Sequence, residues 1–163
     1  MATNEVHVKE FITALTRLDR VALIRLNRDS GKRVQECTCP DVFYRILPDG
    51  VDAWDIPMFF LVATQFANIP NGQTSFPAAF RSIRNKTNAN GLDRRMARLL
   101  DSDRDELLFR LPQCISLMKQ YSIRLNWEQL LTDLLNWQRG YVKSYWGRTY
   151  YSKSKNTSIK IVL

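Results

Sequence analysis

The chain has 163 residues, with 24 lysines and arginines against 16 aspartates and glutamates, so its formal net charge is +8. This length fits one domain, and a composition that is 45% hydrophobic and 11% aromatic excludes an intrinsically disordered protein. No apolar run reaches the ~18 residues that a membrane-spanning helix needs, and the N-terminus lacks the layout of a secretory signal. We therefore expect a soluble, cytoplasmic protein with no membrane partner.

The cysteines and the histidine do not indicate a metal site. Cys37 and Cys39 are too close in sequence to form an easy disulfide, and the single histidine, His7, lies at the far N-terminus. A structural zinc site needs about four ligands from residues of these types. We expect reduced thiols, no metal and no cofactor.

The first third of the chain has helical apolar spacing. Phe11, Leu15 and Leu18 fall on one face of a predicted helix, and Asp19 is a good N-cap for a second one. Residues 29–40 are polar and predict a loop.

A short helix, capped by Asp41, and another that begins near Pro57 are expected next. Residues 68–75 form a turn-rich connector, at which we place a boundary between lobes.

The second half also predicts helices. One runs from Phe76 to about residue 83, whereas residues 85–91 are too rich in asparagine and glycine for regular structure. A helix through Met96 follows, and Asp103 with Glu106 resembles a capping box that opens the next one. Pro112 should kink or split that helix.

Asn126 is expected to cap a final long helix, on which Arg139 and Lys143 share a face. Trp127 and Trp137 fit its apolar stripe, while Trp146 could lie in the core or stack on a base. The pattern thus predicts an all-α fold, a compact bundle of about seven to nine helices in a single domain over residues 1–163. A division into two packed lobes, 1–70 and 75–151, stays open, and residues 152–163 form a C-terminal extension.

The basic charge is concentrated in two segments. Residues 81–98 carry six basic side chains against one acid, and residues 134–163 carry six basic side chains and no acid. Arginine, whose planar guanidinium suits phosphate, supplies 16 of the 24 basic residues. This distribution favours a focused surface for nucleic acid over a uniformly solvated one.

Catalytic signatures are missing from the sequence. It contains neither a phosphate-binding GxxxxGK[ST] loop nor a GxSxG elbow, and one histidine cannot support a two-histidine site. Asp101, Asp103 and Asp105 mimic the start of a calcium loop, but Glu106 stands where glycine is required and Pro112 where a glutamate is required. We expect no enzymatic activity.

The order and spacing of several segments resemble the CasB family, the small subunit of the type I-E CRISPR surveillance complex Cascade. The likeness covers about residues 8–151. It rests mainly on the blocks RRMARLLDSDRDELLFRL (94–111) and LNWEQLLTDLLNW (125–137), supported by FITALTRLDRVALIRL (11–26), VFYRILP (42–48), WDIPMFFLVATQFA (54–67), SFPAAFRSIR (75–84) and VKSYWGRTYY (142–151).

The resemblance implies a helical, non-catalytic subunit of an RNA-guided antiviral complex. It implies two copies along the belly of the complex, in contact with the backbone subunits and the large subunit, that steady the displaced non-target strand beside the CRISPR RNA–target DNA hybrid. The family's strand-contacting positions correspond here to Arg25, Arg94, Arg95, Arg104 and Arg139. The charge pattern adds Arg81, Arg84, Arg98 and Lys143. Pro112 and Gln113 depart from the family, which is often basic there.

Two other functions are compatible with this charge. A free-standing dimeric regulator would need a recognition helix with base-reading side chains, for which residues 81–98 are the candidate. A pure assembly adaptor would instead direct its basic groups, above all those of residues 134–163, at acidic partner surfaces.

Overall fold

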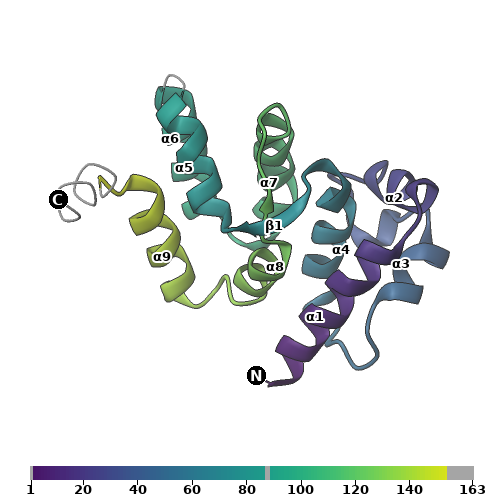
Figure 1. Cartoon of the computed structure of the whole chain (residues 1–163). Helices are drawn as coiled ribbons and strands as arrows, with labels where there is room; N and C mark the ends of the chain where they lie inside the picture. Colours follow the sequence, from purple (N-terminus) through teal and green to yellow (C-terminus); the bar gives the residue numbers. More distant parts are fainter. Residues whose placement is uncertain (1, 87–88, 154–163) are drawn as a thin grey trace.

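The computed structural model describes residues 2–86 and 89–153, which contain nine α-helices, one short strand and two single-turn 3-10 helices, Val34–Glu36 and Phe66–Asn68. The all-α prediction is confirmed, and most of the chain expected as the C-terminal extension lies outside the described residues. No helix in the described ranges is both long and apolar enough to cross a membrane. The helices are α1 (Ala2–Arg17), α2 (Arg20–Asn27), α3 (Pro40–Ile46), α4 (Ile56–Gln65), α5 (Phe76–Lys86), α6 (Ala89–Leu100), α7 (Arg104–Met118), α8 (Trp127–Leu135) and α9 (Gly140–Tyr151) (Figure 1).

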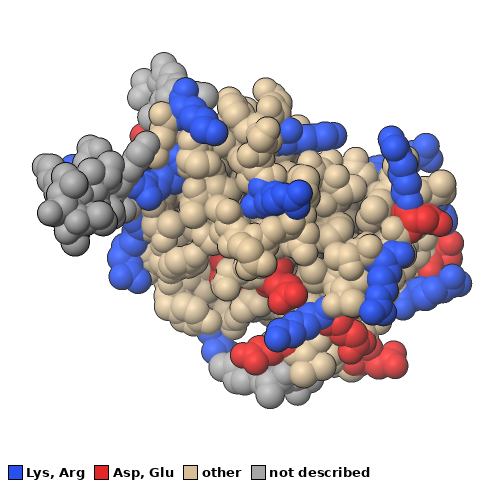
Figure 2. Space-filling model, viewed as in Figure 1, with Lys and Arg blue, Asp and Glu red and all other residues tan. Residues whose placement is uncertain are grey.

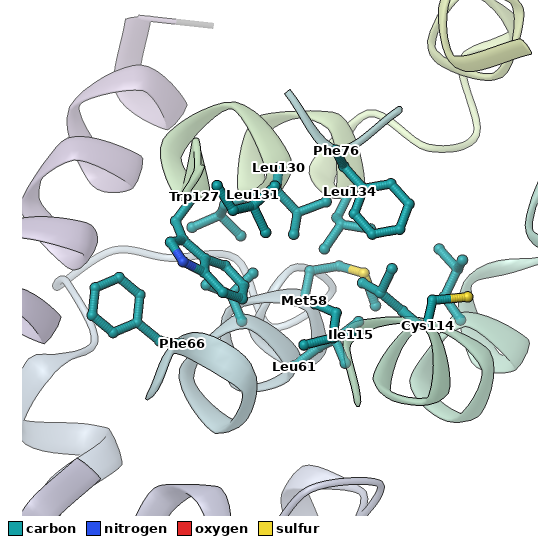
Figure 3. Packing of buried hydrophobic residues seen from close by; sticks show 14 of the residues in the cluster. Met58, Leu61, Phe66, Phe76, Cys114, Ile115, Trp127, Leu130, Leu131 and Leu134 are labelled. Atoms are coloured by element: carbon teal, nitrogen blue, oxygen red, sulfur yellow. The ribbon is translucent and has the colours of Figure 1, made fainter. Parts of the chain in front are cut away.

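Helix α4 forms the centre of the core. Every residue from Met58 to Gln65 is buried, as expected for a helix that is apolar on nearly all sides. Helices α2, α7 and α8 contact it, and α1 packs on α8. The leucines of α8 point toward Met58 and Leu61, while the ring of Phe66 lies 5.6 Å from that of Trp127 (Figure 3). Buried side chains therefore run as one cluster past the connector at 68–75, and the division into lobes stays a prediction.

The prediction of one long C-terminal helix is wrong, because the helix ends at Leu135 and a second one, α9, begins at Gly140. In one continuous helix, Trp137 and Trp146 would lie about 13 Å apart along the axis. The break folds α9 back, so that the two indole rings lie 5.0 Å apart and both are buried. Trp146, left open by the sequence, belongs to the core, where its Nε1 donates to Asp133 at 2.8 Å.

Regular structure extends into the segment expected to be irregular. Helix α5 continues to Lys86 and α6 starts at Ala89. Their packing against α9 explains why: Arg84 donates to the backbone oxygen of Tyr150 at 3.0 Å, and the Tyr150 hydroxyl donates to Asp93 at 2.6 Å. These tertiary contacts offset the low helix propensity of asparagine and glycine.

Two further local predictions are wrong. Pro112 does not split α7, because Leu111, Pro112 and Cys114 are buried in the core and the helix runs unbroken from Arg104 to Met118, while a kink at Pro112 stays a prediction. Asp41 does not cap α3, which begins at Pro40 after Cys39. By contrast, the caps at Asp19, Asp103 and Asn126 are confirmed by side-chain bonds to backbone N–H groups of their helices, at 2.8 to 3.0 Å.

The strand β1 (Asn71–Thr74) was not predicted from the sequence. It makes parallel bridges to Leu125, whose N–H donates to the oxygen of Pro70 at 2.9 Å. Gly72 allows this approach, because a Cβ at that position would lie 2.4 Å from the Cβ of Arg124. The strand therefore holds Leu125, and with it the segment that leads into α8, in place.

Candidate nucleic-acid interface

A groove lies between α6 and α7, beside the turn that follows α2. It consists of two adjoining hollows of about 550 and 320 Å³ that share Arg95, Phe109 and Gln113 in their lining. On the face shown in Figure 2, blue side chains lie along the upper edge, above the upper ends of α5, α6 and α7 in Figure 1; others lie at the left edge and at the lower right, where most of the red atoms are also found. We call this the α6/α7 groove; its other lining residues are Ser30, Gly31, Arg98, Arg110, Pro112, Cys114 and Ser116.

The amphipathic pattern of α6 directs its arginines away from the core. Leu92, Met96 and Leu99 are buried, whereas Arg95 and Arg98 are exposed and reach the groove. Arg94 is also exposed on this helix. Among the described residues, no hydrogen bond or ion pair engages the guanidinium groups of these three arginines. They are therefore available to an anionic ligand.

Arg110 contributes a fixed charge to the same groove. Its guanidinium lies 3.1 Å from Glu106 and donates to the backbone oxygen of Arg98 at 3.0 Å and to the Ser102 hydroxyl at 2.9 Å. Burial raises the pKa of Cys114 to about 12, so this thiol adds no negative charge at neutral pH. The groove lining is positive overall.

An exposed aromatic ring stands in the groove. Phe109 is 48% exposed, although its neighbours on α7, Leu108 and Leu111, are buried. The guanidinium of Arg33 lies 5.9 Å from its ring centroid. Sequence reasoning missed Arg33, Phe109 and Arg110; the available signal was an aromatic residue one position off the apolar stripe of α7.

A second basic hollow lies between α5 and α9. It measures about 340 Å³ and is lined by Arg81, Tyr145, Arg148, Thr149 and Ser152. The Nε atom of Arg81 is buried and has no hydrogen-bond partner among the described residues. Arg84 lies on the same helix, but its guanidinium is held at Tyr150, 5.1 Å from the ring centroid.

Arg25 and Arg104 lie apart from the α6/α7 groove lining and are engaged within the protein. Arg25 forms a bidentate pair with Asp41 at 2.9 and 3.0 Å, and the hydrogen bond from Arg25 holds the pKa of Asp41 below its usual range. Arg104 stacks 4.2 Å from the ring centroid of Trp54 and donates to its backbone oxygen at 2.6 Å.

The remaining predicted positions, Arg139 and Lys143, lie at the start of α9. Arg139 is the exposed N-cap residue rather than part of a helix face, which corrects the expected shared face. The Nζ of Lys143 lies 5.5 Å from the centroid of the Trp137 ring. The structure therefore brings together Arg95 and Arg98, and does not gather all nine predicted residues in one patch; their role in binding stays a prediction.

Three metal-ligating side chains meet in the loop before α3. The carboxylate of Asp29 and the thiols of Cys37 and Cys39 lie within 4.8 Å of one another. However, Asp29 accepts from the backbone N–H and hydroxyl of Thr38, both at 2.8 Å, and pairs with Lys32 at 3.4 Å. Burial alone would raise the pKa of Asp29, but these bonds outweigh it and lower the pKa. The hydrogen-bonding capacity of this carboxylate is thus used within the loop, where it holds Thr38 and Lys32 in place.

Comparison with known proteins identifies the family. A family model for CRISPR-associated protein Cse2 matches residues 19–151. The CRISPR-associated protein Cse2 of Thermus thermophilus is 36% identical over 62 residues, which are 37% of this chain and only 35% of that relative.

Solved structures share the fold over nearly the whole chain. M. ruber CasB matches with a TM-score of 0.73 at 24% identity, over 96% of this chain and 98% of that one. A chain of a CRISPR RNA-guided surveillance complex matches with a TM-score of 0.79 at 16% identity, over 97% and 99%. CasB from Thermus thermophilus matches with a TM-score of 0.75 at 24% identity, over 88% and 97%. Because the family model spans most of the chain, and in agreement with the resemblance to CasB, the protein belongs to the CRISPR-associated Cse2 family.

Proposed function

We propose that this protein is a non-catalytic small subunit of a type I-E Cascade surveillance complex, and that it holds the displaced non-target strand in the α6/α7 groove. Family membership and a likeness to a chain of an RNA-guided surveillance complex support the assembly. The α6/α7 groove, where Arg95 and Arg98 have no hydrogen-bond or ion-pair partner for their guanidinium groups within the described ranges, is the observation that supports strand holding.

The chemistry of the α6/α7 groove fits a single strand better than a duplex. A single strand exposes its base faces, and a base that stacks on an aromatic side chain contributes about 1–3 kcal/mol. Phe109 offers such a face between guanidinium groups that can neutralise phosphates. Contacts of this kind carry no sequence information, which an RNA-guided complex takes from base pairing.

Holding the displaced strand would stabilise the open state of the DNA. Guide–target pairing roughly balances the duplex that it replaces, so modest contributions from protein contacts tip the exchange. We propose that the protein acts as a dimer alongside the backbone subunits and the large subunit. Arg94 would extend the α6 contact, and Arg81 with Arg148 would form a second phosphate contact at α5/α9.

The experiment combines assembly with R-loop lifetime. The protein is co-expressed with its neighbouring gene products and CRISPR RNA, and the displaced strand is followed by permanganate footprinting. An Arg94→Glu/Arg95→Glu/Arg98→Glu variant should assemble normally but shorten the R-loop lifetime. An unchanged lifetime would reject the α6/α7 groove as the holding surface.

The same purification tests the free-standing regulator. That function requires a lone dimer with nanomolar, sequence-specific affinity for duplex DNA. Recovery in that form, without other subunits or RNA, would overturn the proposal of a Cascade subunit. The adaptor function would be favoured instead by two results together. The Arg94→Glu/Arg95→Glu/Arg98→Glu variant would keep a normal R-loop lifetime, and separate variants in residues 134–153 would fail to assemble.

A further inference from the structure

A third hollow, of about 320 Å³, lies where the start of α7 meets the loop before α4. Its apolar floor comes from Pro57, Met58 and Leu108, and Trp54 and Arg104 form one wall. Asp103 and Asp105 stand at its rim. We call it the Trp54 pocket, and it shares no lining residue with the α6/α7 groove.

Trp54 is held in an exposed position. The residue is 59% exposed, unlike the three other tryptophans, which are buried. Arg104 stacks on the indole at 4.2 Å from its centroid and donates to the backbone oxygen of Trp54, while the backbone N–H of Trp54 donates to Asp52 at 2.9 Å. These bonds fix the loop, so that a large aromatic surface stays accessible to a partner.

The surroundings of Trp54 are acidic, although the protein as a whole is basic. Asp103 and Asp105 line the pocket with Arg104, Asp52 accepts from the backbone N–H of Trp54, and Asp55 lies near Arg104, whereas the whole chain carries +8. The carboxylate of Asp55 is half-buried and makes no hydrogen bond or ion pair among the described residues. Burial raises its pKa, and the nearby charge of Arg104 opposes that rise.

We propose that the Trp54 pocket docks a protein segment that presents an arginine or lysine side chain. A cation can lie against the exposed indole and face the carboxylate of Asp105, which lines the pocket, with the carboxylate of Asp55 nearby beside Arg104, while its aliphatic stem covers the apolar floor. Phosphate is repelled by the same carboxylates, so this site is separate from strand holding. Arg104, placed among strand contacts by resemblance, serves here to position Trp54.

The test observes the Trp54 indole directly by NMR in the full chain. The other indole N–H groups donate to Ile69, Ser102 and Asp133 inside the protein. A Trp54→Phe variant therefore assigns the exposed signal. The probes are an acetylated, amidated Gly-Arg-Gly peptide and its citrulline analogue, which keeps the shape of the side chain but lacks its charge.

The arginine peptide should shift the Trp54 signal and leave the other three unchanged, and the citrulline peptide should shift it less. The Asp55→Asn/Asp105→Asn variant should bind the arginine peptide at least about threefold more weakly, because each partly exposed charge pair contributes a few tenths to 1 kcal/mol to binding. The control is Glu5→Gln/Glu10→Gln, which removes two carboxylates from the exposed side of α1. If the double variant does not fold, Asp105→Asn alone replaces it, because Asp105 is exposed; it should also weaken binding of the arginine peptide.

Equal shifts with both peptides, no saturable shift, or displacement of the arginine peptide by single-stranded DNA would overturn the proposal. The peptide titration itself needs neither the complex nor nucleic acid, and single-stranded DNA enters only as a competitor. An Arg95→Gln/Arg98→Gln variant should retain the peptide response, so failure of strand holding and failure of this docking site are distinguishable.

Discussion

Neutralising Arg95 and Arg98 in the α6/α7 groove should change the salt dependence of single-strand binding by a defined amount. Each phosphate contact on a single strand contributes about 0.7 to the slope of log affinity against log salt. Loss of Arg95 and Arg98, which have no protein partners among the described residues, should lower that slope by about 1.4. At about 0.1 M salt this corresponds to roughly a 25-fold loss of affinity.

The assay is fluorescence anisotropy of a labelled oligothymidine with the Arg95→Gln/Arg98→Gln variant across a salt series. The matched control, Lys9→Gln/Arg45→Gln, removes the same charge from exposed positions that do not line the groove. An equal loss of slope in both variants would show that only net charge matters. An unchanged slope in the groove variant would refute the assignment of these arginines to phosphate contacts.

Three further predictions concern the groove, the fold and pH. Phe109→Ala should weaken oligothymidine binding by roughly 5- to 150-fold, which corresponds to about 1–3 kcal/mol, without changing the salt slope; a changed slope would contradict a stacking role. Gly72→Ala should lower the unfolding free energy by about 1–3 kcal/mol in a urea titration, because the added Cβ would lie 2.4 Å from the Cβ of Arg124. The control, Gly91→Ala, has open space around the added Cβ and should not destabilise the protein. The pKa of Asp29 is lower in the folded state, so its carboxylate stabilises the protein above its unfolded pKa of about 3.9, and this contribution is lost as the pH falls. The difference in unfolding free energy between the native protein and Asp29→Asn should therefore shrink below about pH 4, and a constant difference would contradict this assignment.

Local signals in the sequence predicted much of the secondary structure. The caps at Asp19, Asp103 and Asn126 and the exposed face of α6 are set by residues three or four positions apart, so they are readable without the fold. The burial of Trp127 and Trp137 followed from the same periodicity and is confirmed.

Predictions failed where a distant contact outweighed a local preference. The end of α8, where the chain breaks before α9, depends on the packing of Trp137 against Trp146, and the helical segment near residue 89 depends on contacts to Tyr150. The strand β1 depends on the close approach of its backbone to Leu125. Its four residues show no alternation of buried and exposed side chains that could have predicted a strand. Such contacts join residues far apart in sequence and leave no periodic signal.

The sequence by itself determined the helical class, the family and the two segments that carry the basic excess, because composition, periodicity and motif order are properties of the chain alone. Only the tertiary structure decided which cations are available. Arg25 is paired with Asp41 and Arg104 is stacked on Trp54, while Arg95 and Arg98 face a groove beside Phe109. A side chain's freedom depends on which partners the fold brings within a few ångströms, and neither residue type nor spacing along the chain encodes that distance.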